Sequence, residues 1–384
     1  MGLGISKEWI MKHAHIIPLV GGQVVGTSQA LKSKPEYIAS WSAFAKNDYW
    51  CKNYYKDVPF HLVDDPKFRF SKLPKVDLIT CTPPCSGLSS ATTGTAGCQA
   101  PQNEHMINVA TFGMEAGIPV ILIENAPRLY SESGYPFFVR FVPIAEKFGY
   151  SIQLYKTSTM LHGLPQNRIR SFVILWKGKS QPLLNWIREP YVPLTQWPVE
   201  HGLKQYVYPG KGTDDELVRA LYKRFGGRDQ LYSIITMPRT GFKLAQDVGL
   251  AYYEFKTAKY RKLFNRAKYK AVLDVTPTFV KDYTGALMWR ITTFMLSPRE
   301  DRFVSVRELM SMMGLPKDYE ELPLKSMNHI FQNVPTVTTG TIVKEIQQAL
   351  DNKRPFKKVP FMRVNNIDRT IDSIGYTYNS LKLD

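Results

Sequence analysis

At residues 76–86 the sequence reads Val-Asp-Leu-Ile-Thr-Cys-Thr-Pro-Pro-Cys-Ser. The apolar and β-branched residues at its start predict a short, buried strand that ends before the two prolines. Proline restricts its own φ and the residue before it, so Thr82, Pro83 and Pro84 are expected to form a rigid, extended turn. Ligands and catalytic groups collect at the carboxyl ends of strands in an open α/β sheet. Cys85 is therefore a candidate nucleophile, although a small cysteine packed at the end of a core strand would give the same pattern.

The composition indicates a globular protein with a basic surface. Of the 384 residues, 44% are hydrophobic, which is enough for a large core and for about two domains. Lysine and arginine number 50 against 33 acidic residues, which gives a formal net charge of +17. So large an excess of positive charge predicts a polyanionic partner, with nucleic acid the first candidate.

The cysteines and the short length of the apolar runs predict the cellular compartment of the protein. The four cysteines include no Cys-x-x-Cys pair, so neither a zinc site nor a disulfide framework is expected. Reduced thiols are typical of the cytosol. The amino terminus lacks a signal pattern, and no apolar run approaches the ~18 residues of a membrane span. We expect a soluble, cytoplasmic protein that acts as a monomer and has no membrane partner.

Short apolar strands alternate with helices in the first part of the chain, which predicts an α/β fold with a doubly wound, mostly parallel sheet. The helix at 304–316 carries a capping box, with Ser305 as the cap and Glu308 three residues later. Strands are expected at residues 15–20, 37–41, 60–65, 150–157 and 171–176, with two more inside 76–86 and 118–127. Helices are expected up to about residue 31 and at 48–55, 103–117, 135–148, 304–316 and 339–350.

After the first expected strand, residues 21–26 read Gly-Gly-Gln-Val-Val-Gly. A strand, a glycine turn and a helix start commonly cradle a nucleotide-like ligand, because the backbone can approach it where side chains are absent. An ordinary tight turn between a strand and a helix would look the same.

The composition changes near residue 183, where Trp, Tyr, Pro, Lys and Arg become dominant and the α/β alternation is lost. We expect a catalytic α/β domain at 1–182, a smaller irregular domain at 183–290, a return to the first domain at 291–350 and a basic tail at 351–384. Within the smaller domain, residues 255–270 interleave basic and aromatic side chains, which suits phosphate contacts and base stacking. The alternative is a solvated amphipathic helix with its aromatic residues in the core.

Cys85, Glu124, Arg168 and Arg170 together suit attack on an electron-poor heterocycle. A thiolate can add to the ring, a carboxyl can hold a proton, and guanidinium groups can bind a polar ring or a phosphate. Taken singly, each has a simpler explanation. Glu124 could form an ion pair at a strand end, and the arginines could lie on the basic surface.

Taken in order, these segments resemble the cytosine-5 DNA methyltransferases, and the resemblance covers most of residues 15–350. A variable region stands in the place that the family uses for target recognition. The matching segments are Pro83-Pro84-Cys85-Ser86, Glu124-Asn125, Gln166-Asn167-Arg168-Ile169-Arg170, Val306-Arg307-Glu308 with Gly314-Leu315-Pro316, and Asn333-Val334-Pro335.

The resemblance implies a Rossmann-like methyltransferase fold and S-adenosylmethionine as the donor. Cys85 would add to carbon 6 of a cytosine flipped out of duplex DNA, while Glu124 would bind the ring's N3 and exocyclic amine. Arg168 and Arg170 would contact the cytosine carbonyl and the nearby backbone. Residues 87–102, rich in small residues, would form a mobile catalytic loop, and 183–290 would read the major groove.

The sequence departs from the family pattern in the donor pocket. The glycines of the first motif are displaced and no phenylalanine precedes them, Ser42 stands where a ribose-binding acid is expected, and an asparagine near the carboxyl end has moved by one position. Trp41 could stack on the donor, and Asp64 or Asp65 could take the adenine edge. The residues expected to bind the donor are Gly21, Gly22, Gly26, Trp41, Ser42, Asp64, Asp65, Pro83 and Asn333.

These motifs and departures lead to four hypotheses about the function of the protein. The first is a DNA cytosine-5 methyltransferase of a bacterium or of a phage-infected cell. The second is a variant cytosine modifier of the same fold that uses a different donor. The third is a catalytically silent DNA-binding relative that has lost its donor site, and the fourth is an enzyme that modifies a tRNA base.

Overall fold

The computed structural model describes residues 11–85, 88, 103–131, 134–184, 189, 192, 284–285, 305–323 and 327–358. The chain divides into two compact units. The first comprises Met1–Ser158, Ile169–Arg188 and Asn333–Asp384, and the second comprises Thr159–Arg168 and Glu189–Gln332.

A seven-stranded sheet forms the centre of the first unit, in the order β3-β2-β1-β4-β5-β8-β6. Neighbouring strands from β3 to β5 are parallel, whereas β8 is antiparallel to both β5 and β6. The doubly wound, mostly parallel sheet expected from the sequence is thus confirmed. The strands are β1 (His13–Ile16), β2 (Tyr37–Ser40), β3 (Phe60–Leu62), β4 (Leu78–Cys81), β5 (Val120–Asn125), β6 (Tyr150–Ser158) and β8 (Ile169–Lys177).

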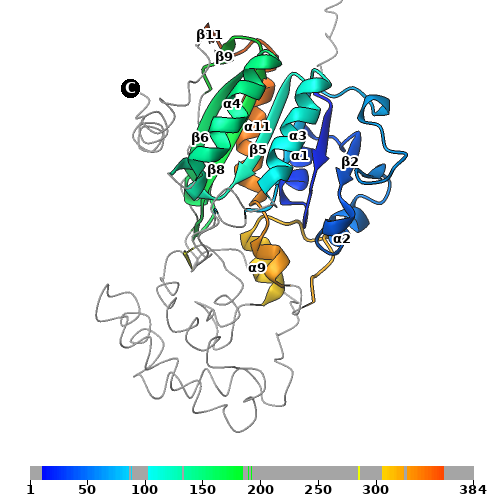
Figure 1. The fold of residues 1–384 in the computed structure, drawn as a ribbon. Coiled ribbons are helices and arrows are strands. Elements are labelled where there is room, and N and C mark those ends of the chain that lie inside the picture. The colour runs from blue at the N-terminus through cyan, green and yellow to red at the C-terminus, as the bar shows by residue number, and fades with distance from the viewer. Residues whose placement is uncertain are drawn as a thin grey trace, which may run out of the picture. The chain divides into compact units, whose positions relative to one another are not determined.

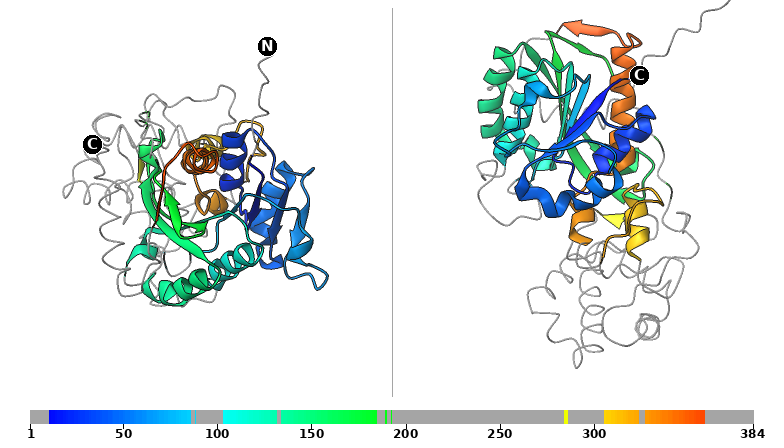
Figure 2. Two further views of the ribbon diagram at one scale, coloured as in Figure 1. Left: turned by 90° about the horizontal axis from the view of Figure 1, so that it is seen from above. Right: turned by 90° about the vertical axis from the view of Figure 1, so that its right-hand side faces the viewer.

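Helices cover both faces of the sheet. Helices α3 (Glu104–Glu115) and α4 (Tyr135–Lys147) lie on one face, and α1 (Gly22–Leu31) and α11 (Thr336–Leu350) lie on the other (Figures 1 and 2). Helix α2 (Ala45–Tyr54) connects β2 to β3. The last long helix of the chain thus packs beside the first, which returns residues after position 333 to the glycine turn.

The apolar core has two layers because side chains in a strand point alternately to opposite faces of the sheet. In β4, Ile79 and Cys81 join the layer under α3 and α4, whereas Leu78 joins the layer under α11. Strand β5 repeats this arrangement, with Ile121 and Ile123 on one side and Val120 and Leu122 on the other. A continuously apolar strand is typical of a parallel sheet that is buried on both faces.

Close backbone packing joins α1 to α11. A Cβ atom added at Gly26 would lie 2.2 Å from the carbonyl oxygen of Thr336, and one at Gly340 would lie 3.3 Å from the carbonyl oxygen of Gly26. Only glycine fits at Gly26 without a backbone shift. The contact gives this residue a packing role, and its predicted part in donor binding stays a prediction.

The first strand differs from the sequence prediction. It covers His13–Ile16 rather than 15–20, so the apolar residues 17–20 lie in the turn after it. The apolar run is misleading because Pro18 has no N–H for a strand ladder, while two histidines occupy the real strand. Two further strands, β9 (Ser180–Pro182) and β11 (Phe356–Lys358), pair antiparallel and join the start of the predicted basic tail to the first unit.

In the second unit, helix α9 (Val306–Met312) has the predicted capping box. The Glu308 N–H donates to Oγ of Ser305 at 3.1 Å, and the Ser305 N–H donates to Oε2 of Glu308 at 2.7 Å. The unit also contains α10 (Met327–Phe331) and the two-residue strands β7 (Gln166–Asn167) and β10 (Thr284–Gly285), which are parallel. The predicted loop at 87–102, the segment at 255–270 and the domain at 183–290 lie almost wholly outside the described residues.

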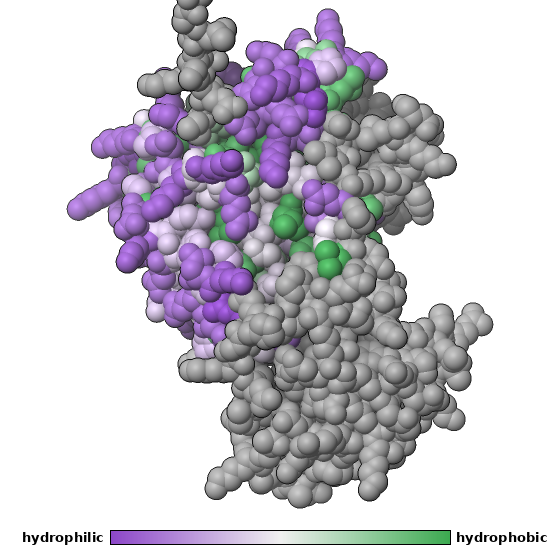
Figure 3. Space-filling view, turned by 180° about the vertical axis from the view of Figure 1, so that it is seen from behind, coloured by the Kyte–Doolittle hydropathy of each residue, from purple (hydrophilic) through white to green (hydrophobic). Residues whose placement is uncertain are grey.

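The described surface is mainly polar. Seen from behind, the first unit shows mostly hydrophilic side chains with small, separate apolar areas (Figure 3). Within the described residues, no helix is both long enough and apolar enough to cross a membrane.

Two histidines of β1 are buried in the sheet. Nδ1 of His13 lies 3.0 Å from Nε2 of His15, Nε2 of His13 lies 3.3 Å from the carbonyl oxygen of Ser33, and Nδ1 of His15 is hydrogen-bonded to the Thr80 hydroxyl. Burial lowers the pKa of His13 to about 4, and burial followed by the neighbouring His13 lowers the pKa of His15 well below 6.5. Both side chains are therefore neutral at pH 7.

These histidines should make the protein less stable in mild acid. Between pH 6.5 and about 4 the unfolded chain binds a proton at His13 and the folded chain does not, so stability falls as the pH falls. His13→Asn should reduce the slope of unfolding free energy against pH by up to ~1.4 kcal/mol per pH unit. Urea unfolding of the wild type and of His13→Asn between pH 5.0 and 6.5 gives the two slopes. The difference between them is the contribution of His13. Equal slopes would contradict the prediction.

Candidate functional site

Parallel strands of the first unit end along one edge of the sheet. The register pairs Ile16 at the end of β1 with Cys81 at the end of β4, and Cys81 in turn with Ile123 in β5. Predicted site residues follow each strand end at this edge. They are Gly21 and Gly22 after β1, Trp41 and Ser42 after β2, Asp64 and Asp65 after β3, Pro83 and Cys85 after β4, and Glu124 near the end of β5.

Cys85 lies four positions beyond the end of β4. Its side chain is partly buried and packs against the core layer under α3 and α4. The Leu88 N–H donates to the Cys85 carbonyl oxygen at 3.0 Å. The two prolines before Cys85 limit its backbone freedom, which is the arrangement a positioned nucleophile requires.

A buried hydrogen bond joins the turn before Cys85 to helix α1. The Thr82 hydroxyl donates to Oε1 of Gln23 at 2.9 Å, and both side chains are almost fully buried. Thr82 was predicted only as part of the rigid turn and Gln23 only as part of the glycine segment, and the bond between them was not predicted. A polar residue in the first turn of an otherwise apolar helix, and another directly before the two prolines, were the signals available.

Glu124 forms an ion pair with Arg170. Nε of Arg170 lies 2.8 Å from Oε1 of Glu124, and the two side chains are 16% and 6% exposed. The antiparallel pairing of β5 and β8 sets Glu124 opposite Phe172, which brings Arg170 to the same end of β5. Burial, followed by the negative charge of Glu124, raises the pKa of the Cys81 thiol well above its usual value. Cys81 is thus a neutral core residue.

Arg168 belongs to the second unit, so the Gln-x-Arg-x-Arg segment crosses the boundary between the units. Its side chain is 2% exposed, and its guanidinium donates to the carbonyl oxygen of Phe331. Nearby, Nε2 of Gln166 donates to the carbonyl oxygen of Met312 at 3.3 Å. These bonds give Arg168 a structural role within its unit, while its predicted contact with a base stays a prediction.

The glycine turn packs tightly against the segment before α11. The Gly22 N–H donates to Oδ1 of Asn333 at 2.7 Å. A Cβ atom at Gly22 would lie 2.0 Å from the carbonyl oxygen of Val334, and Gly21 has a φ of 86°. Glycine is thus required at both positions, by close approach at Gly22 and by backbone conformation at Gly21. Two predicted donor-binding segments, separated by most of the sequence, are in direct contact.

Two residues of the same turn adopt left-handed backbone conformations although they are not glycine. Ile17 has a φ of 56° and Leu19 a φ of 52°. For a residue with a Cβ atom this conformation costs roughly 1–2 kcal/mol, and for a β-branched residue such as Ile17 it is a genuine outlier. The Leu19 N–H donates to Oδ1 of Asp48 on α2 at 3.0 Å, which offsets part of this cost. Asp48 was predicted only as the first residue of a helix and not as part of the site.

Ser42 and Asp64 form a compact polar pair at the ends of β2 and β3. The Ser42 N–H lies 2.9 and 3.1 Å from the two carboxylate oxygens, and its hydroxyl also donates to Oδ2. The Ser42 hydroxyl and N–H lower the pKa of Asp64, so this exposed carboxyl is charged at neutral pH. Asp64 thus supplies a carboxylate beside the position where the family pattern predicts an acid.

The neighbouring Trp41 packs against helix α3. Its ring centroid lies 4.7 Å from that of His105 and 6.3 Å from that of Phe112, with which it is stacked. The side chain is partly exposed. These contacts hold the ring at the strand edge, where its predicted stacking on the donor remains to be tested.

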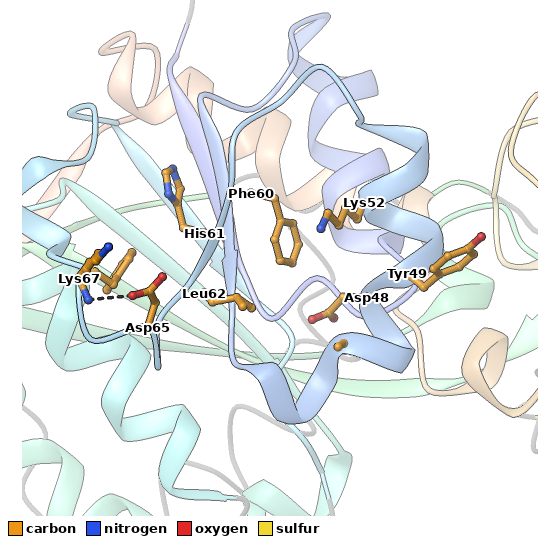
Figure 4. A pocket seen from close by; sticks show the side chains of 10 residues that line it. Asp48, Tyr49, Lys52, Phe60, His61, Leu62, Asp65 and Lys67 are labelled. Atoms are coloured by element: carbon orange, nitrogen blue, oxygen red, sulfur yellow. Dashed lines mark hydrogen bonds between the residues drawn. The ribbon is translucent and has the colours of Figure 1, made fainter.

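Asp65 lines a cavity of about 540 Å³ between α2 and the edge strand β3. Figure 4 shows Asp48 and Lys52 pointing from α2 towards this space, with Phe60 and Leu62 on β3 opposite them. His61 and Lys67 lie on the other side of the strand. Asp48 therefore lies between this cavity and the glycine turn.

A model of the C-5 cytosine-specific DNA methylase family matches residues 17–348. The chain belongs to this family. The resemblance of its motifs is thereby confirmed, and the activity is that of a DNA cytosine-5 methyltransferase. A search among individual curated proteins gave no match.

Solved structures show the same fold as this methyltransferase. A protein described as a DNA modification methyltransferase, encoded within an E. coli prophage, has a TM-score of 0.58 at 15% identity. A methyltransferase of Entamoeba histolytica has a TM-score of 0.51 at 12% identity. Each match covers 89% of this chain and 99% of the other. At such low identity the likeness concerns the fold alone.

In this methyltransferase the ion pair between Glu124 and Arg170 should be strongly coupled. Removing one partner of a buried pair leaves the other charge without compensation, which costs roughly 3–5 kcal/mol. Arg170→Met should therefore lower the free energy of unfolding by roughly 3 kcal/mol. The double variant Glu124→Gln/Arg170→Met should recover most of the loss. Urea unfolding of the wild type, both single variants and the double variant gives the coupling energy, and additive effects would contradict the pairing.

Proposed function

We propose that this methyltransferase uses Cys85 as a covalent nucleophile on a cytosine flipped out of duplex DNA, with S-adenosylmethionine as the donor. The observation that carries the proposal is the Glu124–Arg170 ion pair at the strand edge that also holds Cys85. Attack on a polar ring needs a nucleophile to add to it, a carboxyl group to stabilise the charge that develops, and a guanidinium group to bind the ring. This edge of the sheet carries all three groups.

Each residue has a defined part in the reaction. The Cys85 thiolate forms a bond from its sulfur to carbon 6 of the cytosine, and electron density moves towards the ring's N3 and carbon 5. Glu124, held by Arg170, takes up a proton from solvent and shares it with N3, while its other oxygen accepts from the exocyclic amine, so the negative charge that develops on the ring is neutralised. Arg170 and Arg168 bind the ring carbonyl and the adjoining backbone. After methylation, carbon 5 gives its proton to a water molecule, the electron pair left on carbon 5 forms the double bond to carbon 6, the bond from sulfur to carbon 6 breaks, and the thiolate is regenerated.

The site requires the base to leave the helix. A thiolate must approach the face of the ring, and that face is covered by neighbouring bases in stacked DNA. Flipping the nucleotide costs about a few kcal/mol, which contacts to the exposed base can offset. The buried, directed ion pair of Glu124 and Arg170 suits recognition of a single extruded ring rather than of a stacked base pair.

The described residues fit a donor of the S-adenosylmethionine type, which supplies an electrophilic methyl group when bound. The turn after β1, where Gly22 packs against Asn333 and Val334, is proposed to hold the donor at the strand edge together with Gly21. Asp64, a charged and exposed carboxylate braced by Ser42, suits the hydroxyl and amine groups of a nucleoside. The remaining proposed donor-binding residues are Gly26, Trp41, Asp65, Pro83 and Asn333.

The partner proposed for the basic chain is duplex DNA. The net charge of +17 favours binding to phosphates, and residues 183–290 are the proposed recognition domain, set between 1–182 and 291–350 of the catalytic domain. A monomer acting in the cytoplasm of a bacterial or phage-infected cell accords with this role. Binding of this kind should weaken as the salt concentration rises.

Duplex DNA that contains 5-fluorocytosine tests the nucleophile. Fluorine replaces the proton that must leave carbon 5, so the bond from sulfur to carbon 6 should persist after transfer. The wild type should form a donor-dependent covalent complex that survives denaturing electrophoresis, and Cys85→Ala should form none. The matched control is Cys51→Ala, a buried cysteine on α2, which should still form the complex. A complex that persisted in Cys85→Ala would exclude Cys85 as the nucleophile.

A further inference from the structure

The turn between β1 and α1 has an unusual backbone for a ligand-binding glycine turn. Leu19 lies two positions before the first of its two glycines and adopts the left-handed conformation, with a φ of 52°. Glycine enters this region readily, whereas a leucine does so against steric resistance. The Leu19 side chain is 6% exposed and forms part of the core, so the residue is fixed by packing as well as by its backbone.

Hydrogen bonds from three directions hold this turn. The Ile17 N–H donates to the carbonyl oxygen of Ala39 in β2 at 2.9 Å, and the Gly21 N–H donates to that of Pro18 within the turn at 2.8 Å. The Leu19 N–H donates to the side chain of Asp48 on α2 at 3.0 Å. Asp48 thus provides the side-chain acceptor for the backbone group of the strained leucine.

Asp48 is an unusual residue to bury. Asp48 is 1% exposed, and burial raises its pKa to about 7, against which the Ser40 hydroxyl and then the Leu19 N–H act only in part. An apolar residue at this position would avoid the cost of burying a carboxyl group. The ionisable groups around it are Cys51 on the same helix and Lys52, His61 and Asp65 around the adjoining cavity (Figure 4).

We infer that Asp48 is a positioning residue for donor binding, which holds Leu19 in the left-handed conformation so that the turn at Gly21 and Gly22 keeps its backbone shape. The inference rests on the proposed function, because that function makes this turn the donor site. In this role Asp48 acts on the donor site through the Leu19 backbone. The hydrogen bond from Leu19 to Asp48 favours the left-handed backbone at Leu19. A glycine at position 19 would adopt that conformation without such a bond.

Donor affinity distinguishes this role from a purely structural one. Calorimetry with S-adenosylmethionine should show that Asp48→Leu, which has a similar size and no acceptor, raises the dissociation constant roughly tenfold, about the effect of one strained backbone conformation. Asp48→Asn keeps an oxygen acceptor and resembles the protonated carboxyl, so it should bind within about twofold of the wild type. The control Cys51→Ala, one turn along the same buried helix face, should alter stability but not affinity.

A second substitution tests the backbone part of the inference. In the Asp48→Leu background, Leu19→Gly should recover most of the lost affinity, because glycine adopts the left-handed conformation without help. Leu19→Gly also removes a buried side chain, so each protein is first shown to be folded by its near-ultraviolet circular dichroism. A folded double variant that binds no better than Asp48→Leu would overturn the inference.

The outcomes separate this inference from the proposed function. Wild-type protein that fails to bind S-adenosylmethionine would contradict the proposed donor. Wild-type binding with an equal affinity in Asp48→Leu would overturn the role of Asp48 and leave the donor assignment standing. Equal losses in Asp48→Leu and Asp48→Asn would also overturn it, because the hydrogen bond from Leu19 needs only an oxygen acceptor.

Discussion

The alignment of the parallel strands is the constraint on which the rest of the structure depends. Backbone pairing of β1 with β4, and of β4 with β5, brings Ile16, Cys81 and Ile123 level across the sheet. Any residue that follows one of these strands is thereby placed at the same edge. A glycine turn, a proline-directed cysteine and a paired carboxylate, far apart in the sequence, are consequently brought to the same edge of the sheet. The antiparallel strand β8 completes this edge by bringing Arg170 to Glu124.

Much of this arrangement could be predicted from the sequence, because it follows from local patterns. The apolar strand before Pro83, the capping box at Ser305 and the order of strands and helices are each determined by residues close together in the chain. The first strand was predicted to begin at His15 rather than at His13, because a histidine looks unsuited to a buried strand and the apolar run continues to residue 20. The hydrogen bonds of His13 to Ser33 and of His15 to Thr80 satisfy both rings, but those partners are distant in sequence. The Gln23–Thr82 bond escaped prediction for the same reason.

In the proposed donor site, side chains from elsewhere in the fold lie beside two residues that depart from the family pattern. Ser42 replaces an expected acid, and the charged Asp64 from the next strand is bound directly to it. Leu19 occupies a left-handed position that would suit glycine, and Asp48 from the next helix accepts its N–H. In both places a residue that departs from the pattern is hydrogen-bonded to a side chain that only the folded chain brings near. The sequence motif alone shows that a residue departs from the family pattern, but it does not show which distant side chain lies beside that residue.

The central claim is that this chain transfers a plain methyl group to carbon 5 of cytosine in duplex DNA. The most direct test incubates the protein with duplex DNA and S-adenosylmethionine carrying an isotope-labelled methyl group, then digests the DNA to nucleosides for mass spectrometry. The account predicts that the label appears in 5-methylcytosine and that Cys85→Ala abolishes it. Label in another nucleoside, a different group on cytosine, or no label at all from wild-type protein that binds both DNA and donor would contradict the account.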